Sequence, residues 1–309
     1  MPLTELLIAP LAFIAGFACH RGTVCSVIAA EQIVKSGRTT RLKAFLLAAV
    51  MAGAVTVPLS WFFPDFAKLA PDYGLSLLPV LGGACYGLGA FVNGACAFGT
   101  FARMTQGETT FMLTPIGIGL GVMASITLGL PAMRGPPRPA LLAAPTLQSS
   151  VILAVGAAIA LMALVALVRT FYRAGTRPSR ILTGRHWRPA FAMVVMGLSA
   201  GLLFAIAEPW PWTSLVRQTA TFFAGISVVF PVASILGPIF LLLGGVSSST
   251  MSGRFRWRWP QPLPGLRALA GGALMGSAAS LIPGGNDVMV LFALPALSAS
   301  AVAAYVTMM

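Results

Sequence analysis

The segment from Asn93 to Thr100, with the sequence NGACAFGT, places an amide, two glycines and a thiol at the end of a long apolar run. A helix that faces lipid gains little from these residues, whereas a helix end that lines a polar pathway uses all of them. Glycine lets the backbone approach a ligand closely, and unpaired N–H groups at a helix start attract anions. A thiol adds a weak donor and a polarizable sulfur. The segment therefore predicts a pathway lined by Asn93, Gly94 and Cys96.

A second polar segment, CHRGTVCS at residues 19–26, interrupts the first apolar run. A charged side chain at membrane depth costs at least about 2.5–3.5 kcal/mol, so it usually faces a cavity and marks function. Arg21 presents forked donors that match a small oxyanion, unless it snorkels to an interface or caps carbonyls of a neighbouring helix. His20 is either a proton carrier or a hydrogen-bonded packing residue. We place Arg21 on the pathway and keep His20 as a further candidate.

The four cysteines are Cys19, Cys25, Cys85 and Cys96. In unbroken helices, Cys19 and Cys25 would lie on opposite sides, whereas Cys85 and Cys96 could share a face. Cys25 and Cys96 are the pathway candidates, and Cys19 and Cys85 are favoured as small buried apolar residues. The lack of a CxxC pair and the presence of only two histidines argue against a zinc or iron–sulfur centre. We expect no cofactor, and a structural disulfide is an alternative use of the thiols.

Composition indicates a membrane protein. The chain of 309 residues is 57% hydrophobic and 9% charged, with a mean hydropathy of +0.88, whereas soluble domains are about 25% charged. Apolar runs of about 20 residues, the length that crosses a bilayer, recur along the chain. We expect an all-α polytopic membrane protein with about nine transmembrane helices. The predicted spans are roughly 6–30, 43–64, 75–98, 111–131, 148–168, 190–208, 219–243, 265–283 and 288–308.

The formal net charge of +13 has a placement that argues against nucleic acid as a partner. Most lysines and arginines fall in the loops after the first, third, fifth and seventh predicted spans. The positive-inside rule then puts the N-terminus outside and the C-terminus in the cytoplasm. We interpret the basic loops as topology signals that contact anionic headgroups of the bilayer. The expected location is the bacterial inner membrane.

Two glycine motifs indicate an internal repeat. GGACYG at residues 82–87 is echoed by GGALMG at residues 271–276, and each runs into a glycine-broken segment, the second being PGGND at 283–287. The two motifs lie in the third and the eighth predicted span, an odd offset of five, so the copies run antiparallel. We expect an inverted repeat with broken or re-entrant helices: 1–131, a connecting span and basic loop at 132–189, and 190–309.

Inverted repeats with broken helices build transporters whose site lies at the repeat interface. Irregular backbone at membrane depth is tolerated only where protein or water covers it. The second broken segment therefore adds Gly284, Gly285 and Asn286 to the predicted pathway, with Asp287 and Ser247 as further candidates. The alternative is that the glycines serve close helix packing. Trp210 and Trp212 are predicted to anchor a span at the membrane interface.

Several stretches resemble the YeeE/YedE family of sulfur-compound transporters, whose defining activity is thiosulfate uptake. The matching stretches are Arg21–Cys25, Gly94–Glu108, Ser252–Arg256 and Gly271–Gly276. The resemblance implies an hourglass-shaped inverted repeat of nine spans. It also implies a narrow central path in which cysteines pass thiosulfate along by S–H hydrogen bonds, without covalent chemistry, and a small cytoplasmic sulfur-carrier protein as partner. Cys25 and Cys96 match two of the family's cysteines.

The family's third cysteine falls on Gly285, and no cysteine follows Cys96. A relay by three thiols cannot operate here as it does in thiosulfate transporters. Asn286 could replace a thiol donor by an amide. Asp287 would repel an anion unless it is protonated, paired with Arg21 or Arg217, or turned to an outer vestibule. Other sulfur oxyanions and reduced sulfur species therefore remain open as cargo.

Two function classes follow. The first is a transporter that imports a small sulfur-containing anion. The second is a membrane thiol-relay protein or enzyme that accepts sulfur covalently on Cys96, which needs a thiolate near a base or cation. His20 is the one plausible base within a predicted span. No G-x-x-x-x-G-K-[ST] motif occurs, so nothing in the sequence indicates ATP hydrolysis.

Overall fold

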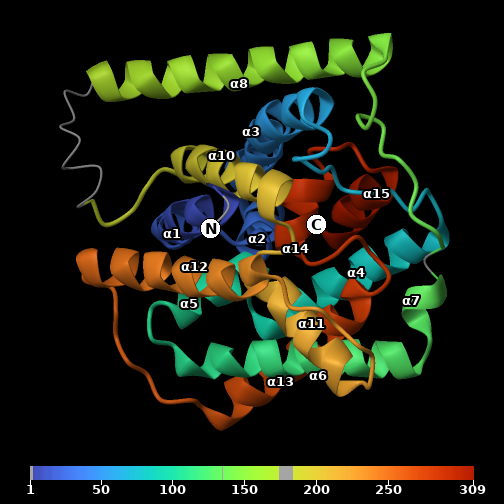
Figure 1. Ribbon diagram of the computed structural model, residues 1–309. Helices are drawn as coiled ribbons and strands as arrows, with labels where there is room; N and C mark the ends of the chain where they lie inside the picture. The colour runs from blue at the N-terminus through green and yellow to red at the C-terminus, as the bar shows by residue number, and fades with distance from the viewer. Residues whose placement is uncertain (1–2, 134, 174–183) are drawn as a thin grey trace.

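The computed structural model describes residues 3–133, 135–173 and 184–309, and this part of the chain is built from helices (Figure 1). The helices are α1 (Leu3–Gly22), α2 (Ser26–Ser36), α3 (Thr40–Phe62), α4 (Leu77–Asn93), α5 (Ala97–Met104), α6 (Leu113–Thr127), α7 (Leu130–Met133), α8 (Leu147–Arg173), α10 (Pro189–Ala207), α11 (Trp212–Phe223), α12 (Val232–Met251), α13 (Pro262–Ala279), α14 (Asn286–Val288) and α15 (Ala299–Met308). A 3₁₀ turn, Thr109–Met112, precedes α6, and a π-helical turn, Met289–Ala293, follows α14.

Seven of the described helical segments are long and apolar enough to cross a membrane. They are Glu5–Ser36, Thr40–Phe62, Leu77–Met104, Thr109–Thr127, Leu147–Arg173, Pro189–Phe223 and Val232–Met251. The chain is therefore an all-α, multi-pass membrane protein, as its composition predicts. The number of nine spans stays a prediction, and residues 174–183 of the predicted basic loop lie outside the described part.

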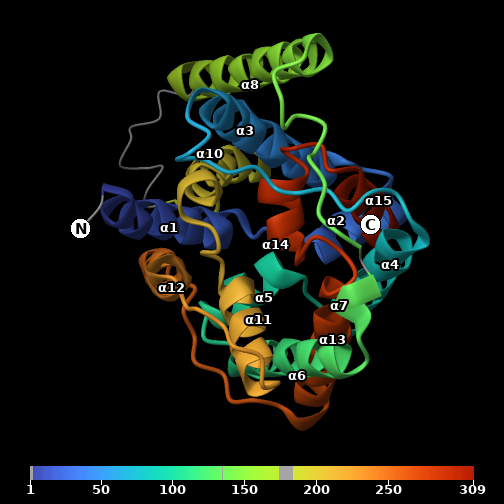
Figure 2. The same cartoon turned by 45° about the vertical axis from the view of Figure 1, so that its right-hand side comes forward.

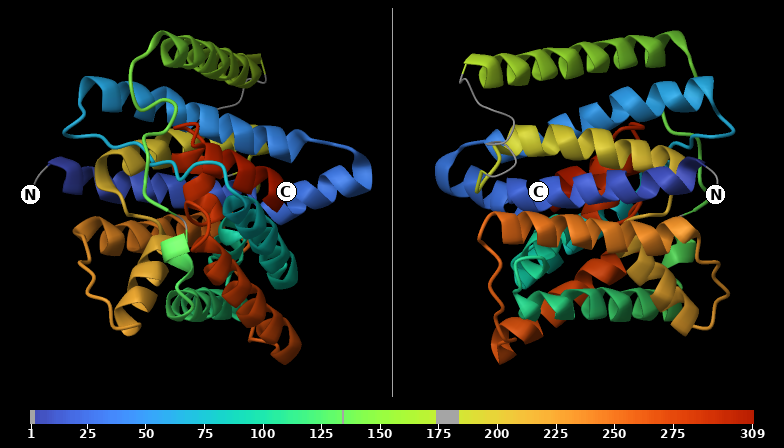
Figure 3. Two further views of the ribbon diagram at one scale, coloured as in Figure 1. Left: turned by 90° about the vertical axis from the view of Figure 1, so that its right-hand side faces the viewer. Right: turned by 60° about the vertical axis from the view of Figure 1, so that its left-hand side comes forward.

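The helices form layers around a centre of short elements. Helix α8 lies outermost, against α3, and its surface is nearly all exposed (Figures 1 and 3). Figure 2 shows α5 and α14 in the middle, between a layer of α1, α3 and α10 and a layer of α6 and α13. Helix α4 packs on α13 and α15, and α12 packs on α1. The interrupted segments are thus enclosed by the long helices.

Glycines bring these helices into close contact. The contacts of the first glycine motif correspond to those of the second. A Cβ on Gly83 of α4 would lie 2.2 Å from the carbonyl oxygen of Ala304 in α15. A Cβ on Gly272 of α13, the equivalent residue of the second motif, would lie 2.5 Å from the carbonyl oxygen of Thr114 in α6. The pair α4–α15 therefore corresponds to the pair α13–α6.

The first glycines of the two motifs, Gly82 in α4 and Gly271 in α13, each contact the helix of the other motif. A Cβ on Gly82 would meet the segment 278–282 at the end of α13, and one on Gly271 would meet Gly89 and Asn93 at the end of α4. Contacts toward the end of α4 thus involve residues farther from the end of α13, so α4 and α13 run antiparallel. This reciprocity is what an inverted repeat produces, and the glycines also serve the close packing that was the alternative reading.

Several predicted spans differ from the helices. The predicted span 6–30 is interrupted, because α1 ends at Gly22 and Thr23 adopts a left-handed φ of 49° before α2 begins. The predicted span 219–243 is wrong in its bounds. Helix α11 ends at Phe223, Gly225 turns with φ 83°, and α12 begins only after Pro231. A proline at the start of a helix has no N–H to leave unpaired, so it suits that boundary.

The carboxylate of Asp72 connects the loop before α4 to the start of α15. Asp72 pairs its backbone with Arg138 and accepts hydrogen bonds on Oδ1 from the Ser298 hydroxyl (2.7 Å), the Ser300 hydroxyl (2.8 Å) and the Ser300 N–H (3.0 Å). Partial burial acts to raise the pKa of Asp72, but the hydrogen bonds from Ser300 and Ser298 outweigh it and hold the pKa below its ordinary value. The carboxylate therefore stabilises the start of α15.

Asp72→Asn is expected to destabilise the protein by about 1–2 kcal/mol at pH 7, because hydrogen bonds to a charged acceptor are lost. A lowered pKa in the folded state contributes stability above the unfolded pKa of about 3.9, and that stability is lost as pH falls through the lower folded pKa. Thermal unfolding in detergent should thus separate variant from parent at pH 7, and the difference should shrink as the pH falls below about 4. The exposed Asp65→Asn is the control, and an equal effect there would contradict the assignment.

Gly83→Val and Gly272→Val are each expected to destabilise the protein by about 1–3 kcal/mol, because a side chain at either position overlaps backbone of the facing helix. Gly156 of α8 has open space around it, so Gly156→Val is the matched control and should change stability little. Thermal unfolding followed by size-exclusion chromatography measures all three. A large effect of Gly156→Val alone would refute the packing argument.

Candidate functional site

Three helices begin near the centre of the protein, each directly after a break. Cys25 is the N-cap residue of α2, Cys96 is that of α5 and Gly285 is that of α14. Each has extended backbone, and none has a side chain that caps the helix. The first N–H groups of a helix have no partner within it, and they carry partial positive charge. The breaks therefore direct hydrogen-bond donors into one region.

The two predicted pathway cysteines meet in this region. The Sγ atoms of Cys96 and Cys25 are 3.9 Å apart, and the N–H of Ser26 donates to Cys96 Sγ at 3.2 Å. Both side chains are buried, and all four cysteines of the chain are free thiols. Gly99 is required here, because a Cβ on it would lie 2.6 Å from Cys25 Sγ. The structure thus forms a thiol pair rather than a disulfide.

Asn286 extends the thiol pair into a polar chain. Its Nδ2 donates to Ser26 Oγ at 3.4 Å, and its backbone N–H donates to the hydroxyl of Tyr86 at 3.2 Å. Asn286 is fully buried, and its Oδ1 has no hydrogen-bond partner among the described residues. We call Tyr86, Asn286, Ser26, Cys96 and Cys25 the polar chain.

The polar chain separates two cavities. Tyr86 lines a cavity of about 50 Å³ together with Gly284, Gly285 and Arg217, which we call the Arg217 cavity; Glu208 and Thr213 also line it. Ser26 lines a groove of about 780 Å³, which we call the Lys35 groove; Glu31, Lys35, Gly94 and Thr307 also line it. Since Tyr86 accepts from the backbone N–H of Asn286 and Ser26 accepts from its side-chain amide, Asn286 is the link between the two spaces.

Asp287 lies beside this link and is buried. Thr213 donates its hydroxyl to Oδ2 of Asp287 at 2.6 Å. Asp287 also lines a small cavity of about 20 Å³ with Cys19, Trp210 and Trp212. Asp287 therefore faces the interior rather than an outer vestibule. In the described part of the chain it forms no ion pair with a predicted partner. The two tryptophans are buried as well, which corrects their prediction as interface anchors.

Arg21 and His20 belong to a different cluster, at the ends of α1 and α12. Arg21 Nε donates to Ser248 Oγ at 3.0 Å, its Nη1 donates to the carbonyl of Gly184, and its guanidinium lies 4.7 Å from the ring centre of Phe17. His20 Nδ1 contacts the same Ser248 hydroxyl at 2.8 Å. None of these contacts involves Cys25 or Cys96, so the structure does not bring Arg21 and His20 to the thiol pair.

Arg254 completes that cluster. Its Nη2 donates to the His20 carbonyl at 2.9 Å and its Nη1 lies 3.2 Å from the Thr23 hydroxyl, so it caps the end of α1. The neighbouring His186 has a pKa below its ordinary value because of desolvation and the charge of Arg254. The cluster therefore stabilises the helix end that precedes the first break.

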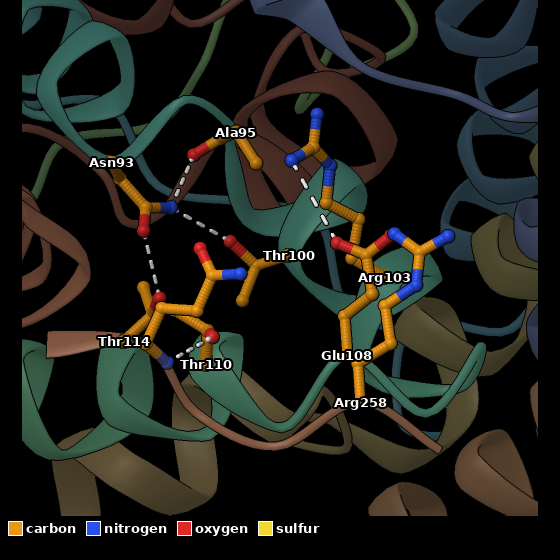
Figure 4. A network of polar contacts seen from close by, with 9 residues as sticks. Asn93, Ala95, Thr100, Arg103, Glu108, Thr110, Thr114 and Arg258 are labelled. Atoms are coloured by element: carbon orange, nitrogen blue, oxygen red, sulfur yellow. Dashed lines mark hydrogen bonds and ion pairs between the residues drawn. The ribbon is translucent and has the colours of Figure 1, made fainter. Parts of the chain in front are cut away.

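Asn93 is used within the second break. Its Nδ2 donates to the Ala95 carbonyl (2.6 Å) and the Thr100 hydroxyl (2.9 Å), and its Oδ1 accepts from Thr114 (2.8 Å) (Figure 4). Gly94 follows with a left-handed φ of 74°, a conformation that favours glycine. The amide thus holds the loop that ends in Cys96 and has no donor left for a ligand.

A charged network lies next to this break. Figure 4 shows Glu108 between Arg103 and Arg258, at N–O distances of 3.9 Å and 3.5 Å. These three side chains line a cavity of about 350 Å³ that also reaches Asn93 and Gly94. Because the ion pairs are partly exposed, they contribute little stability by themselves.

The remaining predicted residues lie apart from the polar chain. Cys85 is exposed on α4, which corrects its prediction as a buried residue. Cys19 is buried, as predicted, and its Sγ lies 3.7 Å from the Phe98 carbonyl oxygen. Ser247 is half-buried, and its carbonyl accepts from the Thr250 hydroxyl. The sequence reasoning missed Ser26, Tyr86 and Thr213. Signals for the first two were present, because Ser26 follows Cys25 directly and Tyr86 lies inside the first glycine motif.

The comparison with known families agrees with this geometry. The family model for sulphur transport matches residues 21–309. The chain belongs to the sulphur transport family. The resemblance to YeeE/YedE proteins is thereby confirmed, and the chain is a membrane transporter of sulfur compounds. A search of curated proteins finds no match.

Asn93→Ala is expected to destabilise the protein by about 2 kcal/mol or more, because buried groups of Ala95, Thr100 and Thr114 lose their partner. Thr127→Val in α6 removes an exposed hydroxyl and serves as the control. Thermal unfolding of the purified variants measures the difference. If Asn93→Ala retained the parent's stability and lost only transport, the assignment of a structural role would be wrong.

Proposed function

We propose that the protein imports a small sulfur-containing anion, with thiosulfate as the first candidate, along the polar chain between the Arg217 cavity and the Lys35 groove. One observation carries the proposal: two free thiols, an amide and a serine form a continuous hydrogen-bonded sequence whose ends line two separate cavities. The family provides the class of cargo.

The chemistry of the polar chain suits an anion with soft sulfur. Helices α2 and α5 begin at the thiol pair, so their first N–H groups, which have no partner within the helix, favour negative charge. Asn286 and Ser26 add neutral donors, and sulfur is polarizable enough to contact a sulfur atom of the cargo. Arg217 and Lys35 each provide a positive charge at one end of the route. No metal or nucleotide is needed for this passage.

The route is closed in the described conformation. The contacts that close it are weak, since Asn286 Nδ2 lies 3.4 Å from Ser26 Oγ and the two Sγ atoms are 3.9 Å apart. Such long hydrogen bonds lose little when they are exchanged for bonds to a ligand. We infer that the anion passes by replacing these contacts in turn, each thiol donating its S–H to the cargo without forming a covalent bond.

The positive-inside rule orients the route. The Lys35 groove lies on the side of the loops rich in lysine and arginine, and this side is the cytoplasm in our proposal. The Arg217 cavity then faces outside, the N-terminus lies outside and the C-terminus inside, in a bacterial inner membrane. The repeats 1–131 and 190–309 enclose the route, with 132–189 as connector. A small sulfur-carrier protein would receive the cargo at the groove.

A second candidate is covalent sulfur transfer to Cys96. The position of Cys96 at the start of α5 favours a thiolate, because helix N-termini lower the cost of negative charge. The predicted base, His20, contacts Ser248 and Arg254 instead. Covalent transfer would need a base near Cys96, whereas passage by hydrogen bonds needs none. We therefore favour a transporter without enzymatic activity.

Cys96→Ser is expected to retain part of the thiosulfate uptake, because a hydroxyl still donates a hydrogen bond, whereas Cys96→Ala should lose at least about tenfold. Cys25→Ser and Cys25→Ala should follow the same order. The measurement is growth on thiosulfate alone, and uptake of labelled thiosulfate, in a bacterium that lacks sulfate and thiosulfate import.

Cys85→Ala is the matched control, since this thiol lies outside the polar chain. Complete loss with serine at position 96, at normal protein levels, would favour the covalent route instead. No thiosulfate uptake by the parent protein in the membrane would overturn thiosulfate as cargo, and uptake of other sulfur oxyanions would then be compared.

Asn286→Ala is expected to lower uptake by about tenfold or more while leaving stability nearly unchanged, because its side chain makes one long hydrogen bond and leaves Oδ1 unpaired. The contrast is with Asn93→Ala, which should act on stability. Uptake and thermal unfolding measured on the same preparations separate the two roles. Normal uptake by Asn286→Ala would remove the amide from the route.

A further inference from the structure

A buried carboxyl lies beside the polar chain without a cation. Asp287 is 5% exposed, and its Oδ1 has no hydrogen-bond partner among the described residues. The ion pairs found in the described part of the chain join Glu31 to Lys35 and Glu108 to Arg103 and Arg258. None involves Asp287. A buried carboxylate that lacks a counter-charge is costly, and such groups take up a proton instead.

The free oxygen of Asp287 points to the route. A Cβ built on Gly285 would lie 2.6 Å from Oδ1 of Asp287 and 3.4 Å from the Tyr86 hydroxyl. The carboxyl oxygen thus fills the space that a side chain at position 285 would occupy, beside Gly285, which lines the Arg217 cavity. An anion that moves from the cavity past Gly285 to Asn286 would come close to this oxygen.

The titratable groups that interact with the carboxyl are acids, which never carry a positive charge. They are Cys19 on α1, Tyr86 on α4 and Cys96 at the start of α5. Thr213 on α11 donates to its Oδ2. The nearest charged groups that line the adjoining cavity are Glu208 and Arg217, and they also attract each other electrostatically. The site therefore offers Asp287 no fixed positive charge, and an incoming anion makes ionisation still less favourable.

We propose that Asp287 carries a proton with each anion, so that import is coupled to the inward movement of protons. This inference rests on the proposed import of an anion. Protonated Asp287 can donate a hydrogen bond from its free oxygen to the cargo, whereas the ionised form would repel it. The proton enters from water in the Arg217 cavity, and it leaves toward the Lys35 groove after the anion has passed, which regenerates the carboxylate for the next cycle.

The test uses the full-length protein in vesicles with labelled thiosulfate. Valinomycin and equal potassium on both sides hold the membrane potential at zero. With one proton per anion, an alkaline interior of one pH unit is expected to drive up to about tenfold accumulation. A pH-sensitive dye inside the vesicles should also report acidification when thiosulfate is added outside without an imposed gradient.

Asp287→Asn keeps the shape and a donor but cannot release a proton. We expect it to show counterflow exchange of thiosulfate at a reduced rate, with no accumulation driven by the pH gradient and no acidification. Asp65→Asn is the matched control, because Asp65 is an exposed acid that lines neither cavity of the route. This variant should retain the response to the gradient.

Three outcomes would overturn the inference. Exchange by the parent protein with no response to the gradient would show uncoupled transport. A gradient response that survives in Asp287→Asn, or that is lost in Asp65→Asn as well, would contradict Asp287 as the proton carrier. Absence of counterflow in the parent would refute the proposed import of thiosulfate itself, and proton coupling with it. Thermal unfolding of each variant excludes misfolding as the cause of a lost response.

Discussion

Backbone N–H and C=O groups have no water to bond with inside a bilayer, so a membrane helix can be interrupted only where protein or a water-filled cavity covers the break. This protein interrupts its helices after Gly22, at Gly94 and before Asn286. The long helices cover these breaks because they approach one another on glycine, as at Gly83 and Gly272. The close helix packing is therefore the condition for everything at the centre.

The breaks that require this cover also make the site. Each one turns the start of a short helix toward the same small region, which concentrates N–H groups without a partner in their own helix there and introduces no fixed positive charge. The thiols and the amide are neutral, so along the proposed route an anion would meet donors that hold it weakly. Weak holding is what a transport route needs, since a site that bound its cargo tightly would also retain it.

The sequence predicts the class of fold and the segments that matter, but not how the side chains are shared among roles. Cys25, Cys96 and Asn286 were recognised because polar residues in apolar runs are costly and therefore informative. Arg21 is equally costly, yet its role depends on Ser248 and Gly184, which are distant in the sequence. Hydropathy gives the depth of a residue and not the direction of its side chain.

Other errors have equally local causes. The predicted span 219–243 joined two helices because an apolar window passes over the turn at Gly225 and the start at Pro231. Trp210 and Trp212 were assigned to the interface from their type, whereas Phe204 and Phe292 form a stack that Trp210 joins inside the protein. A tryptophan is common both at the membrane interface and in the protein interior, and the fold determines which of the two environments it occupies.

The crowding between positions 285 and 287 limits which pairs of side chains these positions can hold. With Oδ1 of Asp287 in the space beside Gly285, a thiol introduced at 285 would force the carboxyl away from the position in which Thr213 holds its other oxygen. A cysteine side chain at 285 and the aspartate side chain at 287 would thus occupy the same small volume. A cysteine at 285 is therefore expected to be accommodated most easily when residue 287 changes with it.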